Sequence, residues 1–332
     1  MISSLQQQNV HDVSKEKMEE VVTSRKHSNT QISLQVPLPA SLSEKDGLWT
    51  ITIPRGMLLS EPIVISTVLN SSLQKAKIVI VVEEEASAVI FETQKSFDQC
   101  NDVEQYQHQE VEVHTHRSAK LTYCTLHKTN FTSSSAIVKR GFVAENASLT
   151  WVDVLCGGRS TTFDLQTNHQ GKAAQSKAFT LYYGTEGQLF EINTQTDHQA
   201  ELASGLMKAR GILADNARVS YRGAVNISSR GGGAVAHQKS ETILLGDRAH
   251  CDALPVLNVH HDDVICSHGA AMGRFEESAL FYLISRGLEE KMAMQLLIES
   301  FFQDYLRDVP SQGFICEIQQ VLKEKMERST IK

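Results

Sequence analysis

Cysteine and histidine side chains gather in one short stretch, from Cys251 to Gly269. These 19 residues hold two of the six cysteines and three of the thirteen histidines in the chain. If this stretch is extended, Cys266 and His268 point to the same face, because strand side chains alternate with a period of two. A thiolate and an imidazole on one face form half of a soft metal site, suited to iron–sulfur or zinc chemistry. We therefore predict Cys266 and His268 as metal ligands.

Cys251 lies 15 residues before Cys266, and we expect it on an adjacent strand or across a subunit interface. It is the third candidate for holding sulfur or a cluster. An isolated cysteine more often behaves as a small buried hydrophobe. On that basis four other cysteines are predicted to be structural: Cys100, Cys124, Cys156 and Cys316. Cys316 is expected on the buried side of the last helix.

Several catalytic motifs are missing from the sequence. The glycine-rich stretches 157–160 and 231–233 lack the Lys-Ser/Thr that completes a phosphate-binding loop, and the second more simply marks a bulge or tight bend. Neither a Gly-x-Ser-x-Gly nucleophile elbow nor a His-Glu-x-x-His zinc motif occurs. We predict that this chain binds no nucleotide by the phosphate-loop route.

The chain divides into three zones that differ in composition and residue pattern, and these zones must position the candidate residues. Residues 1–30 are polar, with a possible short helix and a tail. Residues 31–273 are rich in β-branched side chains, and apolar and polar residues alternate along them. Gly, Asn, Asp and Ser separate these alternating stretches, which predicts strands joined by turns. Residues 274–332 predict three helices, at about 275–285, 289–306 and 311–328. Gly287 and Pro310 separate these helices.

The strand zone contains a recurring phrase: a turn residue, then alanine, then alternating apolar residues. Its alanines are Ala86, Ala119, Ala147 and Ala217, with a looser copy at Ala249. The interval of 70 residues before Ala217 is read as two periods of a repeat near 30. A repeat of that length without an internal helix favours stacked coils of strand over a β-sandwich, whose turns come every 8–12 residues. We predict a mainly β fold, a parallel β-helix followed by a helical segment.

Composition limits the class of protein. The net charge is −7, with 41% hydrophobic and 21% charged residues, and no basic stripe suggests nucleic-acid binding. No run of 18 apolar residues and no apolar signal core are present, so we predict neither a membrane span nor secretion. The cysteines form no Cys-x-x-Cys pair. We expect a cytoplasmic protein with reduced thiols.

Two segments together resemble the SufB/SufD family. The first is Cys-Ser-His-Gly-Ala at 266–270, and the second is Phe-Tyr-Leu-Ile-Ser-Arg-Gly at 281–287. The two segments occurring together are more specific than any single motif. The likeness is strong over the last 85 residues or so and looser back to about residue 31.

The resemblance implies a right-handed parallel β-helix that pairs with a second subunit, alike or different. It also implies that the C-terminal helices dock SufC, an ATPase of the ABC type. Such a complex assembles iron–sulfur clusters transiently and passes them to apo-proteins. On this basis this chain is a scaffold rather than an enzyme, and its partner hydrolyses ATP. The docking surface falls on the second segment, including Phe281, Tyr282, Arg286 and Gly287.

The family's functional residues match unevenly. Cys266 and His268 match the Cys and His of SufD-type chains, which lie at the subunit interface. SufB-type chains have a Glu where Gly269 stands, and Cys251 is a loosely aligned counterpart of their upstream Cys. A SufB-type or SufD-type role, and a homodimer or a heterodimer, therefore all stay open.

Two other classes of protein are compatible with the sequence. One is a structural adaptor that gives shape to an ATPase complex and touches no metal. The other is a β-helix enzyme acting on carbohydrate, with Asp262 and Asp263 as its acids. Adjacent strand residues face opposite ways, so these two aspartates make a poor acid/base pair, and they are more typical of a solvated turn.

Overall fold

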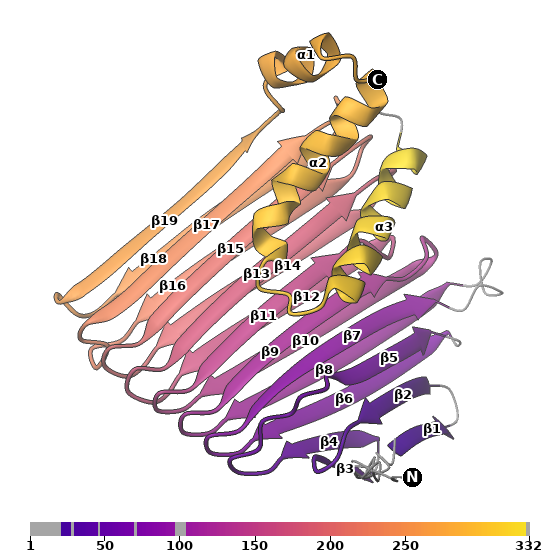
Figure 1. Ribbon diagram of the computed structural model, residues 1–332. Coiled ribbons are helices and arrows are strands. Elements are labelled where there is room, and N and C mark those ends of the chain that lie inside the picture. Colours follow the sequence, from indigo (N-terminus) through magenta and orange to yellow (C-terminus); the bar gives the residue numbers. More distant parts are fainter. Residues whose placement is uncertain (1–20, 28–29, 46, 70–71, 97–103, 330–332) are drawn as a thin grey trace, which may run out of the picture.

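Two β-sheets face each other in the computed structural model, which describes residues 21–27, 30–45, 47–69, 72–96 and 104–329. From β4 onward the chain alternates between the sheets, so each strand as far as β17 lies beside the strand two places later in the sequence. The result is a parallel β-solenoid of about 7 turns (Figure 1). The predicted mainly β fold, a parallel β-helix with a C-terminal helical segment, is confirmed.

The first sheet has ten strands in the described part of the chain. In spatial order they are β1 (Val21–His27), β2 (Thr30–Val36), β5 (Ile63–Leu69), β7 (Ser87–Ser96), β9 (Lys120–Lys128), β11 (Ser148–Leu155), β13 (Gln175–Gly184), β15 (Ser204–Leu213), β17 (Ala234–Leu244) and β19 (Val264–Gly273). From β5 onward all neighbours are parallel, whereas β1 and β2 are antiparallel additions at the N-terminal end. Both of these begin before residue 31, the predicted start of the β-helix.

The second sheet has nine strands among the residues that the structure describes. In spatial order they are β18 (His250–Val259), β16 (Arg218–Ile227), β14 (Leu189–His198), β12 (Ser160–His169), β10 (Ser133–Val143), β8 (Gln105–Thr115), β6 (Leu73–Val82), β4 (Leu48–Ile53) and β3 (Ser41–Lys45). Within these described strands, only β3 runs antiparallel to its neighbour. Along each strand, alternate residues enter the interior, where Ile78, Ile80, Trp151 and Phe163 belong to one continuous apolar core.

The alanine of the recurring phrase lies at a corner of a coil in each case, but the copies occupy two different corners. Ala86, Ala119 and Ala147 are buried at the corner that leads from the second sheet to the first. Ala217 lies at the opposite corner, between β15 and β16, and Ala249 lies there too, before β18. Reading the 70-residue interval as two periods was therefore wrong. Both corners turn the chain into a packed interior, so both favour a side chain as small as alanine.

The predicted helices are confirmed as α1 (Glu277–Ser285), α2 (Glu290–Leu306) and α3 (Gln312–Arg328). Figure 1 shows α2 and α3 lying across the outer face of the first sheet. Phe314 of α3 stacks on Phe91 with ring centroids 4.8 Å apart, and Tyr305 of α2 meets Phe179 edge-on at 5.5 Å. None of the helices in the described ranges is long and apolar enough to span a membrane.

One cysteine prediction is wrong. Cys316 is exposed on α3, not on its buried side. The larger side chains Phe314 and Ile318 set the buried face, and Cys316, two positions from each of them, falls about 200° around the helix. Cys124 and Cys156 are buried, as predicted, and Cys100 lies outside the described residues. The glycines at 231–233 form a tight turn between β16 and β17, as expected.

Candidate functional site

The last coil of the solenoid ends in two strands, β18 and β19, that contact each other across the interior. Each is the terminal strand of its sheet, so within the described part of the chain each pairs along one edge only. Side chains that would be interior in an earlier coil are therefore partly uncovered here. Figure 1 shows this end of the solenoid opposite the end that carries β1 and β3. The candidate site lies on this uncovered end.

Cys266 and His268 lie on the inward-facing side of β19. Cys266 stands in register with the buried Ala236 of β17, and His268 with the buried Gln238. Cys266 is half-buried against the edge of the apolar core, whereas His268 is exposed. Two positions along one strand separate their Cα atoms by about 7 Å. The structure therefore brings this thiol and this imidazole together on one face, where both are accessible from the open end.

Cys251 lies on the inward face of β18 in a different setting. Its side chain is 5% exposed, and its Sγ donates a hydrogen bond to Thr242 Oγ1 at 3.4 Å. Burial raises the pKa of the Cys251 thiol, and the Thr242 hydroxyl offsets only part of that rise. The thiol form is therefore favoured, whereas the thiolate is the species that binds metal.

Cys251 lies far from the other two candidates within one chain. Its partner Thr242 is six residues beyond Ala236 on β17, and Ala236 is the residue beside Cys266. Six strand residues span about 20 Å. Among the described residues, no group of three His, Cys, Asp or Glu side chains is close enough to hold a metal ion.

Three buried polar side chains next to this site were not predicted from the sequence. Gln238, Ser240 and Thr242 are buried on the inward face of β17, directly under β19. The signal was present, because alternate polar residues in a strand indicate that one face is polar. Their inward orientation depends on the register of the coils, which one sequence does not reveal.

The predicted docking residues lie on or beside α1, which has no buried residue. Phe281 is 72% exposed and Tyr282 is 56% exposed. The Arg286 guanidinium lies over the Tyr282 ring, 5.2 Å from its centroid, and Gly287 ends the helix with a φ of +93°. Such an exposed aromatic surface is typical of a protein-interaction site.

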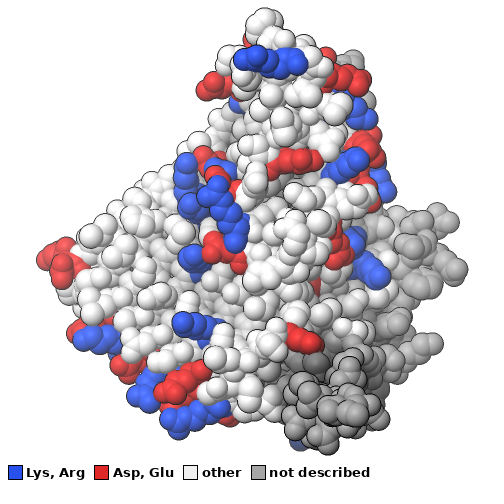
Figure 2. All heavy atoms as spheres, viewed as in Figure 1, with Lys and Arg blue, Asp and Glu red and all other residues white. Residues whose placement is uncertain are grey.

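Charge is unevenly distributed over the molecule. In Figure 2, drawn in the view of Figure 1, charged side chains of both signs lie on the helices and along the turns. Few lie over the region of β17 and β19. An uncharged strand edge is suited to pairing with another strand.

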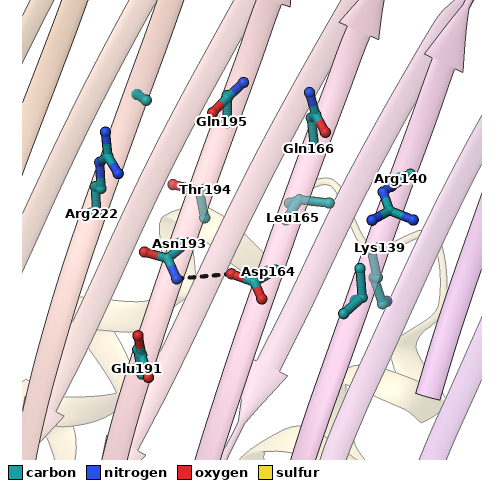
Figure 3. A pocket seen from close by; sticks show the side chains of 12 residues that line it. Lys139, Arg140, Asp164, Leu165, Gln166, Glu191, Asn193, Thr194, Gln195 and Arg222 are labelled. Atoms are coloured by element: carbon teal, nitrogen blue, oxygen red, sulfur yellow. Dashed lines mark hydrogen bonds between the residues drawn. The ribbon is translucent and has the colours of Figure 1, made fainter. Parts of the chain in front are cut away.

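A second depression lies on the outer face of the second sheet (Figure 3). It has a volume of about 530 Å³, and Arg140 and Arg222 flank Asp164 and Glu191 within it. Asn193 Nδ2 donates to Asp164 Oδ1 at 2.8 Å, so this carboxylate is held by its neighbour in the strand ladder. This polar surface offers hydrogen bonds and charges of both signs.

The aspartates of the carbohydrate-enzyme alternative lie elsewhere. Asp262 and Asp263 are exposed in the turn between β18 and β19. This is the solvated turn that the sequence predicted for them.

Comparison with known proteins identifies the class that this fold and site define. The family model for the SUF system FeS cluster assembly, SufBD core domain, matches residues 64–301. The chain belongs to this family, whose members act as scaffolds in iron–sulfur cluster assembly. The matched region includes Cys251, Cys266 and His268 together with α1 and most of α2.

Curated relatives carry the same description. Iron–sulfur cluster assembly SufBD family proteins from Staphylococcus epidermidis, Staphylococcus saprophyticus and Staphylococcus aureus are each 26% identical to this chain over 219 residues. That region is 66% of this chain and 47% of each relative. The chain thus spans about half the length of the curated relatives it matches.

Proposed function

We propose that this chain is a scaffold on which Cys266 and His268 hold sulfur and iron while a cluster is built at an interface between two solenoids. The observation that carries the proposal is the position of these side chains, on the inward face of the terminal strand β19 and open at its end. Thiolate and imidazole are both suitable iron ligands. Membership of the SufBD family supplies the link to cluster assembly.

The second solenoid completes the site. Strands β18 and β19 each present an unpaired edge in the described part of the chain, and an edge of this kind pairs with another strand. A second copy, or a SufB/SufD paralogue, docked on this end would place its own terminal strand beside β19. Cys266 and His268 would then provide two ligands, and the partner subunit the rest.

A SufC-type ATPase is the second proposed partner, because this sequence has no phosphate-binding loop of its own. Its docking surface is α1 with the start of α2, where Phe281, Tyr282 and Met292 are exposed. A pocket of about 510 Å³ lies beside it, lined by the apolar Leu280, Met294 and Met326 together with four charged residues and a serine. Apolar side chains of this kind suit a protein contact.

A chain of contacts joins this docking region to the candidate site. Arg210 Nη1 donates to the backbone oxygen of Phe301 in α2 at 2.5 Å. The same guanidinium pairs with Glu241 of β17 at 2.9 Å. Glu241 lies between Ser240 and Thr242, and Thr242 accepts the hydrogen bond of Cys251. Movement of α2 driven by ATP would therefore act on β17 and uncover the buried Cys251 thiol.

The test is anaerobic cluster reconstitution of this chain with its SufC-type partner, followed by absorption and Mössbauer spectra. Cys266→Ser is expected to leave the fold and the docking intact and to abolish the cluster. Cys251→Ala is expected to weaken assembly, and Cys316→Ser is the matched control because that thiol is exposed on α3.

Two results would contradict the proposal. A normal cluster on the Cys266→Ser variant would remove that residue from the site. The absence of any cluster in a well-formed wild-type complex would identify the chain as a structural adaptor. Successful assembly should also be followed by transfer of the cluster to an apo iron–sulfur protein.

A further inference from the structure

Gln238 is buried beneath His268 with no hydrogen-bond partner in the described part of the chain. Its side chain is 3% exposed, yet neither Nε2 nor Oε1 of its amide is bonded. The hydroxyl of Ser240, two positions along the same face, is also unbonded among the described residues. A buried polar atom without a partner costs about 1–3 kcal/mol. Two such side chains under one site therefore indicate that something else satisfies them.

A glycine on the opposite sheet leaves room for the Gln238 amide. Gly223 of β16 lies across the interior, and a Cβ at that position would be 2.5 Å from Nε2 of Gln238. Burial raises the pKa of the neighbouring Tyr221, and the Thr194 hydroxyl and the Gln238 amide beside it partly offset the rise. The Tyr221 hydroxyl itself bonds Thr194 Oγ1 at 2.8 Å. The amide nitrogen thus lies beside the Tyr221 hydroxyl, and the amide oxygen remains free to bind a further group.

At these positions the interior changes from apolar to polar between β15 and β17. In register with Gln238 and Ser240, the preceding strand β15 carries Met207 and Ala209, both buried in the apolar core. On the other side, β19 carries His268 in register with Gln238. Neighbouring strands are about 4.8 Å apart, so a rotation of the exposed imidazole would bring it within hydrogen-bond reach of the amide.

We propose that Gln238 is a positioning residue for His268, an inference that rests on the proposed function. The imidazole rotates so that Gln238 Oε1 accepts the N–H of one of its ring nitrogens, a bond that the present side-chain positions do not form. This bond fixes the tautomer of the imidazole and turns the other ring nitrogen toward the open end, where iron would bind. Ligating histidines generally donate their second N–H to an oxygen, and loss of that oxygen typically lowers metal affinity 10–100-fold.

The test uses the full-length, metal-free chain with ¹⁵N-labelled histidine, at a pH where the ring is neutral. Two-bond ¹H–¹⁵N spectra show which ring nitrogen carries the proton, and the His268 signal is assigned by its loss in His268→Gln. Wild type is expected to show one tautomer, and Gln238→Leu a mixture. Gln238→Glu keeps an oxygen at the same reach and is expected to retain the single tautomer.

A matched control is Gln74→Leu. Gln74 of β6 is 1% exposed and, among the described residues, both of its amide atoms also lack partners, but it lies far from the site. This control should leave the His268 signal unchanged. Leucine also removes a buried unbonded amide, so neither leucine variant should unfold, and circular dichroism verifies this.

The outcomes separate this inference from the proposed function. An unchanged His268 tautomer in Gln238→Leu, or an equal change in Gln74→Leu, overturns the positioning role even if His268→Gln abolishes the cluster. Normal cluster formation by His268→Gln overturns the proposed function, whatever the tautomer. With both in place, Gln238→Leu should bind iron about 10–100-fold more weakly than wild type.

Discussion

Phe281 offers a way to separate docking of the ATPase from folding of the chain. Its ring is 72% exposed on α1, a helix with no buried residue. A fully enclosed aromatic side chain buries about 150–250 Å², so about 110–180 Å² of Phe281 is available for burial by a partner. At about 25 cal/mol per Å², this area corresponds to about 3–4.5 kcal/mol.

Part of that free energy is lost in Phe281→Ala and part remains with the alanine methyl group. We therefore expect binding of the SufC-type ATPase to weaken by about 2–3 kcal/mol, or about 30–150-fold in Kd. The stability of the chain should be unchanged, because the ring makes no buried contact in α1. Isothermal titration calorimetry measures the binding, and urea unfolding measures the stability.

The matched control is Leu58→Ala, which removes a side chain of similar exposure, 70%, at the other end of the solenoid. Its Kd should equal that of wild type. An unchanged Kd for Phe281→Ala, or equal weakening by both variants, would refute the assignment of α1 as the docking surface.

Two predictions concern the solenoid itself. Lys139 Nζ and Asp153 Oδ1 form a fully buried ion pair at 2.6 Å. We expect Asp153→Asn to lower the free energy of unfolding, measured in urea, by about 3–5 kcal/mol. The double variant Lys139→Met/Asp153→Leu should recover most of that loss. A loss below about 1 kcal/mol in Asp153→Asn would contradict the prediction. Burial lowers the pKa of His198 to about 4, so between pH 6.5 and 4 the unfolded chain takes up a proton that the folded chain does not. In this window the free energy of unfolding should therefore decrease by about 1.4 kcal/mol for each unit by which the pH is lowered, as the contribution of this group. His198→Asn should reduce that slope, and a slope identical to that of wild type would disprove the prediction.

The fold was predictable because its signals are local. Alternation with a period of two, the small residue at each corner and the breakers Gly287 and Pro310 each act within a few residues, and they gave the coils and the three helices. The assignment of Ala217 failed because the two corners impose the same size limit, so the same phrase serves both. The side of α3 that holds Cys316 depends on which larger residues meet the sheet, and that is set by tertiary packing.

The candidate site was predictable only along one strand. The shared face of Cys266 and His268 follows from strand geometry alone. The position of Cys251 depends on how the two sheets face each other, a relation between strands that the sequence does not encode locally. Gln238 escaped notice for the same reason, since an inward-facing glutamine has no feature of its own in the sequence until the register places it beneath a histidine.

The two ends of the solenoid differ, and this difference limits how copies can polymerise. At one end β18 and β19 each present a ten-residue edge. At the other, within the described residues, the outermost strands are the five-residue β3 and the seven-residue β1, and both run against the direction of their neighbours. Short, reversed strands are poor templates for pairing. Head-to-tail growth into a fibre is therefore disfavoured, and the proposed association through the long edges would close after two solenoids as a twofold or pseudo-twofold pair.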